Sequence, residues 1–166
     1  LGNGSAVGSG LPVQVSEMRG WVSVSAGRAH AVGIRVNEAG VRELWAWGAN
    51  EFGQLGIGMS GVSAYRTAPV GVGVEKTWVG VSGGGAFSLA LKADGSLWGF
   101  GTGALMELGA VVSGGMSKVP VAVGGALRFK AVAAGGSLRG SRPASRRPPA
   151  QRRLHGPHSR ARHDGG

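Results

Sequence analysis

The chain has 166 residues, enough for one small domain, and its 18 Lys and Arg against 8 Asp and Glu give a net charge of +10. Eight of the arginines lie in residues 137–166, where Asp164 is the sole acidic residue, so the high charge belongs to this tail. The absence of cysteine excludes disulfides and thiolate metal sites. No apolar run approaches the ~20 residues of a membrane-spanning helix, and we expect no membrane span. The opening Leu1-Gly2-Asn3 predicts a turn rather than a targeting leader, and we interpret it as an internal cut of a longer chain.

Three short sequence patterns recur along the chain at similar offsets. A seven-residue segment, residues 21–27, returns as residues 78–84 and 129–135, at offsets of 57 and 51 residues. A Pro-Val pair recurs at the same offsets, and a Leu-Gly pair recurs at offsets of 54 and 53. The pairs are Pro12-Val13, Pro69-Val70 and Pro120-Val121, and Leu1-Gly2, Leu55-Gly56 and Leu108-Gly109. Such self-similarity indicates a repeat architecture.

Each repeat predicts four short strands. The segment that starts with Trp21 or Trp78 is the first; residues 29–36 and 86–93 form the second; residues 41–48 and 95–101 form the third. The Pro-Val segment before each new repeat is expected to be an outer strand, where the missing N–H of proline is tolerated. After the alternating Leu44 to Trp47, we expect Gly48, Asn50 and Gly53 to take positive φ in tight turns.

Four strands in about 50 residues, with many glycines and no helical period, are typical of a β-propeller blade. We therefore predict an all-β chain, a partial β-propeller of four-stranded antiparallel blades in an incomplete ring. The expected boundaries are 1–20 for the end of one repeat, 21–77 and 78–128 for full repeats, 129–136 for the start of a third, and 137–166 for a disordered tail. The five tryptophans are expected to pack between adjacent blades. The residues that define the repeat are Trp21, Gly27, Trp45, Trp47, Gly48, Asn50, Gly53, Gln54, Leu55, Gly56, Trp78, Gly84, Trp98, Gly101, Leu108 and Gly109.

The pattern Leu-Trp-x-Trp-Gly-x-Asn-x-x-Gly-Gln-Leu-Gly over residues 44–56, set between Val-Ser-Ala-Gly and Pro-Val, resembles the repeat of the regulator of chromosome condensation family. The resemblance covers about residues 1–136, or two and a half repeats, and implies a propeller, typically of seven blades. The second repeat departs from the pattern, with Gly103, Met106 and Glu107 at the positions of Asn50, Gly53 and Gln54. The glycine-rich, lysine-poor body is more similar to bacterial members, and for these an extracellular or cell-surface setting is an open alternative. The compartment stays undetermined.

Residues 137–166 combine arginine and proline with few large apolar side chains, a composition that predicts disorder. Two interpretations stay open. In the first, which we favour because the composition changes where the repeat breaks, the tail is translated out of frame. In the second, the tail is native and its arginines bind nucleic acid or another acidic partner.

No enzymatic constellation is evident. Residues 56–61 match the Gly-x-Gly-x-x-Gly spacing, but no helix is predicted to follow, so a repeat loop is favoured over a dinucleotide site. His30 is interpreted as a hydrogen-bonded structural histidine, and His155, His158 and His163 as chance composition rather than a metal site. We expect no catalytic residues, cofactor, metal or small-molecule substrate.

The leading interpretation is a non-enzymatic protein-interaction scaffold with an unknown protein partner. Binding would use the loops between strands, which include residues 51–65 and 101–118. The eukaryotic namesake of the family implies an alternative, a guanine-nucleotide exchange factor acting on a small GTPase. Nucleic-acid binding through the tail is the third alternative.

Overall fold

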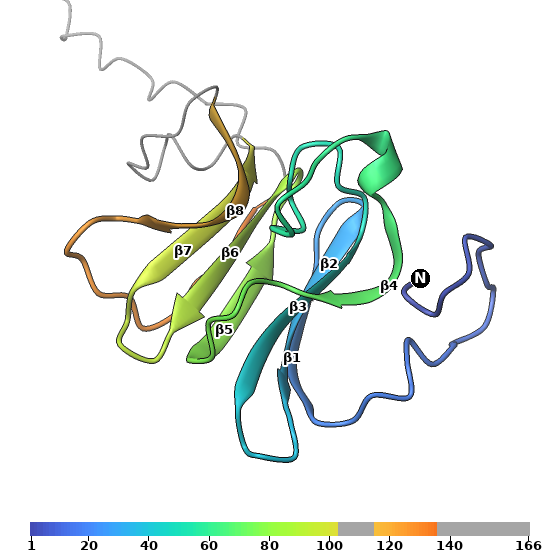
Figure 1. The fold of residues 1–166 in the computed structure, drawn as a ribbon, viewed down its shortest axis with the longest axis horizontal. Coiled ribbons are helices and arrows are strands. Elements are labelled where there is room, and N and C mark those ends of the chain that lie inside the picture. Colours follow the sequence, from blue (N-terminus) through green and yellow to red (C-terminus); the bar gives the residue numbers. More distant parts are fainter. Residues whose placement is uncertain (103–114, 136–166) are drawn as a thin grey trace, which may run out of the picture.

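The computed structural model describes residues 1–102 and 115–135. Two four-stranded antiparallel sheets stand side by side (Figure 1). The first, which we call blade 1, contains β1 (Trp21–Ala26), β2 (His30–Val36), β3 (Arg42–Gly48) and β4 (Arg66–Gly71) in that order. The second, blade 2, contains β5 (Trp78–Gly83), β6 (Phe87–Lys92), β7 (Leu97–Thr102) and β8 (Met116–Val123). One turn of 3-10 helix, η1 (Val62–Ala64), precedes β4. The predicted all-β fold of propeller blades is confirmed.

The two blades repeat each other in irregularities as well as in strand order. A register shift follows Trp21 in β1 and recurs after Trp78 in β5. A second shift lies between Ala46 and Gly48 in β3, and between Gly99 and Gly101 in β7. Bulges bend and twist a sheet locally. The repeat in the sequence therefore extends to the shape of each sheet.

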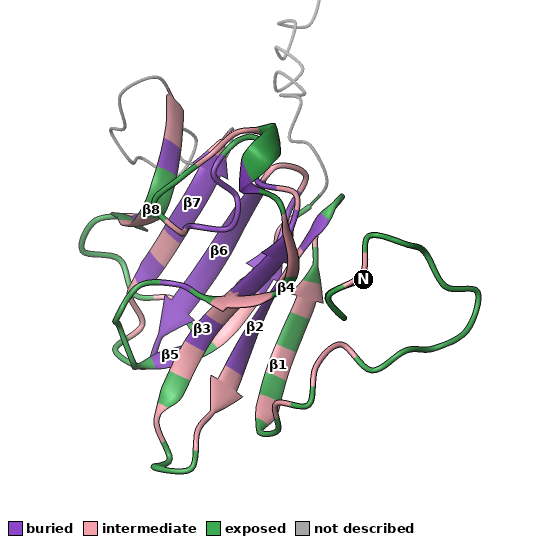
Figure 2. Ribbon diagram, turned by 45° about the vertical axis from the view of Figure 1, so that its right-hand side comes forward, coloured by how far each residue is buried: buried purple, intermediate pink, exposed green. Residues whose placement is uncertain are grey.

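The main core lies between the blades. Blade 1 contributes one face of β2 and β3, blade 2 contributes one face of β5, β6 and β7, and the fully or almost fully buried side chains are Val32, Ile34, Leu44, Ala46, Leu55, Val72, Trp78, Ala90 and Phe100. Figure 2 shows β6 and most of β7 buried, whereas β1 alternates between exposed and half-buried residues. A second cluster on the far face of blade 2 contains Phe87, Leu89, Leu97 and Val123.

Two segments differ from the expected strands. Pro69 and Pro120 lie in the outer strands β4 and β8, as predicted, but Pro12 lies outside any strand. Residues 129–135, which match the first strand of a repeat, also form no strand. In both cases the described residues include no neighbouring strand with which the segment could share backbone hydrogen bonds.

Candidate functional site

The loop between β3 and β4, residues 49–65, is held by one buried side chain. Asn50 is 1% exposed; its Nδ2 donates to the Met59 carbonyl oxygen at 2.9 Å, and its Oδ1 accepts from the Leu55 backbone N–H at 3.0 Å. Its own carbonyl oxygen accepts from the N–H groups of Gly53 and Gly61. The expectation that Asn50 has positive φ is wrong, because positive φ occurs only at glycines among the described residues. Asn50 fixes the loop with its amide group instead.

The middle of this loop packs onto blade 2. Leu55 is fully buried in the core between the blades, and the Gln54 carbonyl oxygen accepts a hydrogen bond from Ser88 Oγ at 2.8 Å. Gly53 and Gly56 both have positive φ, at 76° and 68°. A Cβ on Gly53 would lie 2.8 Å from the Ser117 carbonyl oxygen, and one on Gly56 would meet the Phe100 ring. The Gly-Gln-Leu-Gly segment is therefore both a turn and an interblade contact.

The rest of the loop presents large apolar side chains to solvent. These are Phe52, Met59, Val62 and Tyr65, of which Val62 is 79% exposed. Held by Asn50 and Leu55, the loop can offer these side chains with little loss of conformational entropy on binding. The loop was expected to bind partners; which of its side chains stay exposed could not be read from the sequence.

His30 lies at the interface between the blades. Its Nε2 is 2.9 Å from Ser88 Oγ, so the expected structural hydrogen bond is present. Burial lowers the pKa of His30 to about 4, opposed in part by the Phe87 backbone. A neutral, buried imidazole of this kind fits a packing role.

The tryptophans form two similar groups. In blade 2, Trp78 and Trp98 meet edge to face at 6.1 Å, and Lys92 Nζ lies 3.9 Å from the centre of the Trp98 ring. In blade 1, Trp21 meets Trp45 at 6.4 Å and Trp47 at 5.7 Å, also edge to face. The expected packing between blades holds for the blade 2 group, which faces blade 1. The blade 1 group lies on the face of its sheet that points away from blade 2.

Glycines in the repeat pattern stand where a side chain would collide. Gly27 and Gly84 lie against the rings of His30 and Phe87. Gly48 and Gly101, with φ of 98° and 96°, lie against the backbone at the start of β2 and β6. Leu108 and Gly109, and the second-repeat residues Gly103, Met106 and Glu107, lie outside the described residues.

Contacts at both ends of the described part of the chain recur with the repeat. The Gly4 N–H donates to the Thr67 carbonyl oxygen at 2.9 Å, as the Gly58 N–H donates to that of Lys118 at 2.8 Å. At the other end, Ser25 Oγ accepts from the Gly83 N–H at 3.0 Å, and Ser82 Oγ accepts from the Ala134 N–H at 2.8 Å. The first and last described residues therefore lie against the blades in the way that the middle of the chain does.

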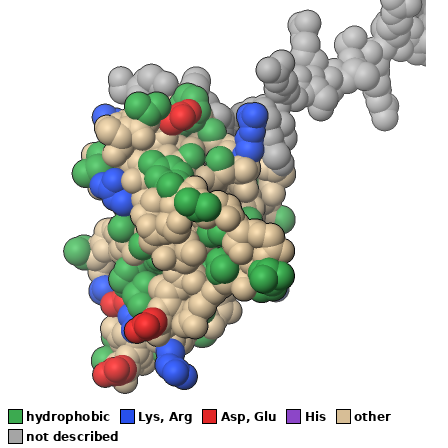
Figure 3. Space-filling view, turned by 90° about the vertical axis from the view of Figure 1, so that its right-hand side faces the viewer, with side chains coloured by type: hydrophobic (Ala, Val, Ile, Leu, Met, Phe, Trp, Pro, Cys, Tyr) green, Lys and Arg blue, Asp and Glu red, His purple; other side chains and the backbone are tan. Residues whose placement is uncertain are grey.

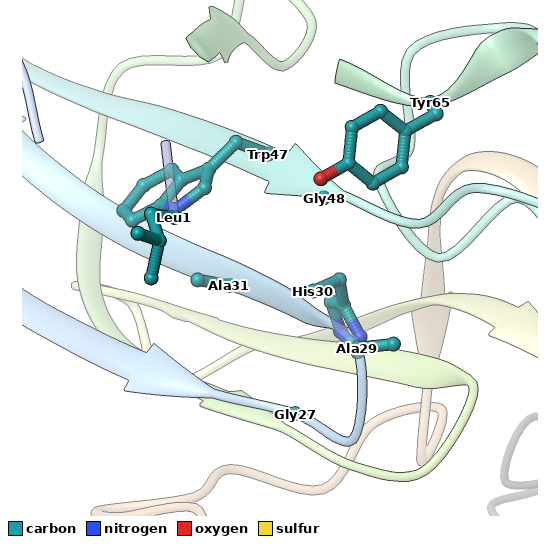
Figure 4. A pocket seen from close by; sticks show the side chains of 8 residues that line it. All are labelled: Leu1, Gly27, Ala29, His30, Ala31, Trp47, Gly48 and Tyr65. Atoms are coloured by element: carbon teal, nitrogen blue, oxygen red, sulfur yellow. The ribbon is translucent and has the colours of Figure 1, made fainter. Parts of the chain in front are cut away.

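A pocket of about 210 Å³ opens on blade 1 (Figure 4). Leu1 and Trp47 lie together on one side of it, His30 and Ala29 lie on another, and the Tyr65 hydroxyl points toward Gly48. Its remaining lining residues are Gly27 and Ala31. No pattern in the sequence indicated this pocket.

Other motifs gain no support as chemical sites. Residues 56–61 are followed by the single turn η1 and then by β4, and a dinucleotide site requires a helix there. The described residues hold no group of three or more side chains that could bind a metal ion. His155, His158, His163 and the arginine pairs of the tail lie outside them. No helix in the described part of the chain is long and apolar enough to cross a membrane.

Comparison with known proteins agrees with the resemblance in the sequence. Residues 43–91 match the family described as the regulator of chromosome condensation (RCC1) repeat. The E3 ubiquitin-protein ligases HERC2 of Homo sapiens and Mus musculus are 32% and 31% identical over 115 residues, which is 66% of this chain and 2% of each ligase. The chain thus spans a very small part of these curated relatives.

Solved structures share the fold. Yeast RCC1 (Prp20) bound to Kap60 gives a TM-score of 0.58 at 24% identity, covering 72% of this chain and 29% of the yeast chain. Human WBSCR16 gives 0.52 at 24% identity, covering 64% and 26%. The match over residues 43–91, together with the relatives, shows that the chain contains a regulator of chromosome condensation repeat, and the solved structures share its fold.

Proposed function

We propose that the chain is part of a protein-interaction scaffold, and that the loop of residues 49–65 is its contact surface. One observation carries the proposal: a loop anchored by the buried Asn50 presents Phe52, Met59, Val62 and Tyr65 to solvent. Rigid, exposed apolar side chains are the usual centre of a protein interface.

The similar proteins support this class of function. The yeast structure was solved with Kap60 bound, and a second yeast Prp20p structure was described together with binding to Gsp1p and histones. We propose, by analogy, that a protein is also the partner of this chain.

A photo-crosslinking amino acid placed at position 62 tests the loop directly. The matched control is position 74, where Val74 is 84% exposed in the connection between β4 and β5. The proposal expects protein adducts from position 62 that are missing from position 74. The double variant Phe52→Ser with Val62→Ser should weaken binding of the captured protein at least ~10-fold. The same adducts from both positions would count against the loop.

Two alternatives need separate assays. If the chain is a guanine-nucleotide exchange factor, adding it should speed the release of bound nucleotide from a small GTPase. Nucleic-acid binding through residues 137–166 predicts affinity that falls steeply with salt and disappears when those residues are deleted. A deletion without effect ends that alternative, and resequencing of the coding DNA in all three frames tests whether the tail is in frame.

We further propose that the repeats divide at residues 1–20, 21–77, 78–128 and 129–136. The recurring contacts of Gly4 with Thr67 and of Ser82 with Ala134 support the outer boundaries. In this division, the glycines and tryptophans of the repeat pattern have a structural role: they join one blade to the next.

A further inference from the structure

The tryptophan face of blade 1, formed by Trp21, Val24, Ala31, Trp45 and Trp47, has no second sheet packed on it among the described residues. The same face of blade 2 is buried against blade 1: Trp78 is fully buried, and Val81 and Trp98 pack on the core. Val24, the repeat equivalent of Val81, is instead 57% exposed. Figure 3, which looks at the side where the N-terminal residues lie, shows hydrophobic side chains scattered over its middle and charged ones mainly toward its borders.

The pocket is part of this face. Its residues Ala31, Trp47 and Gly48 are the repeat equivalents of Ser88, Phe100 and Gly101 in blade 2. On blade 2 the corresponding space is filled by blade 1, whose His30 imidazole and Gln54 carbonyl oxygen both contact Ser88 Oγ. The pocket is therefore the place that a neighbouring blade fills, and in the described part of the chain Leu1 lies there beside Trp47.

The opposite face of the pair, on blade 2, carries Phe87, Leu89 and Leu97, which we call the leucine face. It is covered by a single segment without a strand partner in the described chain, residues 129–135, whose Phe129, Val132 and Ala134 pack on it. These three residues are the repeat equivalents of Trp78, Val81 and Gly83. The leucine face thus accepts the first strand of a blade.

We propose that the tryptophan face of one molecule binds the leucine face of a second copy, with β1 of the first molecule replacing residues 129–135 of the second. The interface continues the one already present between the two blades. In that interface the polar His30 meets the polar Ser88; in the intermolecular one, Phe87 of the second copy meets Ala31. An apolar side chain thereby enters a pocket whose wall includes Ala31 and Trp47.

The exchange replaces partial contacts by a whole sheet. Residues 129–135 leave the leucine face, and a sheet with three tryptophans takes their place. In the first molecule, Leu1 to Gly4 leave the pocket in favour of the partner's blade. Because the two faces differ, the association is head to tail, and it grows into rings or open chains with concentration.

The first test measures the mass of the 166-residue chain by sedimentation from about 1 to about 100 μM. The proposal expects species larger than a monomer at high concentration, together with a blue shift of the tryptophan fluorescence as Trp21 and Trp45 are buried. Val24→Lys places a charge on the tryptophan face and should prevent both changes. Val74→Lys, at a more exposed position in the connection between β4 and β5, should behave as the parent chain.

The second test blocks each face in turn and mixes the blocked chains. Because the chain has no cysteine, Ser82→Cys with Ala134→Cys can lock residues 129–135 onto blade 2, where Ser82 Oγ is 2.8 Å from the Ala134 backbone nitrogen. The locked chain and Val24→Lys should each stay monomeric, and their mixture should form a one-to-one dimer that goes no further. Reduction of the lock should restore self-association.

The outcomes decide whether a second copy of the chain binds the tryptophan face. A parent chain that stays monomeric up to the highest concentration overturns the proposal and leaves the face to a blade other than one from a second copy. Association of Val24→Lys to the same extent as the parent, or a mixture without the dimer, also overturns it. The heterodimer cannot arise from misfolding of either variant, since each then has to present an intact complementary face.

Discussion

His30 Nε2 and Ser88 Oγ lie 2.9 Å apart across the interface between the two blades, and Ser88 Oγ donates in turn to the Gln54 carbonyl oxygen at 2.8 Å. His30 is 5% exposed and Ser88 is fully buried. Three segments of the chain, β2, the β3–β4 loop and β6, thus meet in one chain of hydrogen bonds. A change in any one of its members acts on how the blades are joined.

Acid should weaken this interface. Because the pKa of His30 is lowered from 6.5 to about 4, the unfolded chain binds a proton more readily than the folded chain between these values. The free energy of unfolding therefore has its full value above about pH 6.5 and falls as the pH drops toward 4. Below pH 4 it is lower by about 3 kcal/mol. Urea unfolding measured at pH 7.5, 5.5 and 4 checks this. His30→Phe, which introduces the residue found at position 87, should remove this part of the pH dependence; an unchanged pH dependence would exclude His30 as its source.

Loss of the Asn50 side chain should loosen the β3–β4 loop. Asn50→Ala removes two hydrogen bonds and leaves the Leu55 N–H buried without a partner, so we expect the free energy of unfolding to fall by about 2–3 kcal/mol. Asn3→Ala, which removes only a local contact to the Ser5 N–H near the surface, should change it by less than about 0.5 kcal/mol. Equal effects of the two substitutions would contradict an anchoring role for Asn50.

Two glycines with positive φ should differ in their tolerance of alanine. Gly101 has φ of 96°, and a Cβ there would lie 2.7 Å from the Phe87 Cα, so Gly101→Ala should cost at least about 3 kcal/mol. Gly58 has φ of 83° with nothing within 4 Å of a Cβ, so Gly58→Ala should cost only the backbone strain of about 1–2 kcal/mol. Thermal unfolding of the two variants gives the comparison. If Gly58→Ala proved the more damaging, the close approach at Gly101 could not be the reason.

Lys92 should stabilise the interface through its charge. Its Nζ lies 3.9 Å from the Trp98 ring centre, 5.2 Å from that of Trp78 and 2.9 Å from Glu75 Oε2. Lys92→Met keeps the aliphatic length and should cost about 1–2 kcal/mol, since a cation shielded from water interacts strongly with aromatic faces. Lys76, half-exposed beside Glu43, is the matched control, and Lys76→Met should cost less than about 0.5 kcal/mol. Denaturant titration measures both; similar losses would assign Lys92 to ordinary surface pairing.

The strands and their grouping were predictable because alternation, turn residues and the repeat are local properties of the sequence. Local sequence does not tell which face of a sheet meets a neighbouring sheet, as the positions of Trp21, Trp45 and Trp47 show. The sequence predicted that all five tryptophans pack between blades. The structure places them on the equivalent face of each sheet, but only the face of blade 2 meets another sheet among the described residues, so only Trp78 and Trp98 lie between blades. Likewise, Asn50 follows a strand where glycine is common, and only its hydrogen bonds to Met59 and Leu55 show that it acts through its side chain.

The sequence by itself determined the repeat, the blades and the family, since each blade is specified by hydrophobic alternation and by glycines within about 50 residues. Only the tertiary structure decided which surfaces are buried and which remain open. Val81 and Val24 occupy the same place in their repeats, yet Val81 packs on the core between the blades and Val24 lies exposed. Burial depends on the neighbour that a face meets, and that is a property of how whole sheets pack rather than of any single segment.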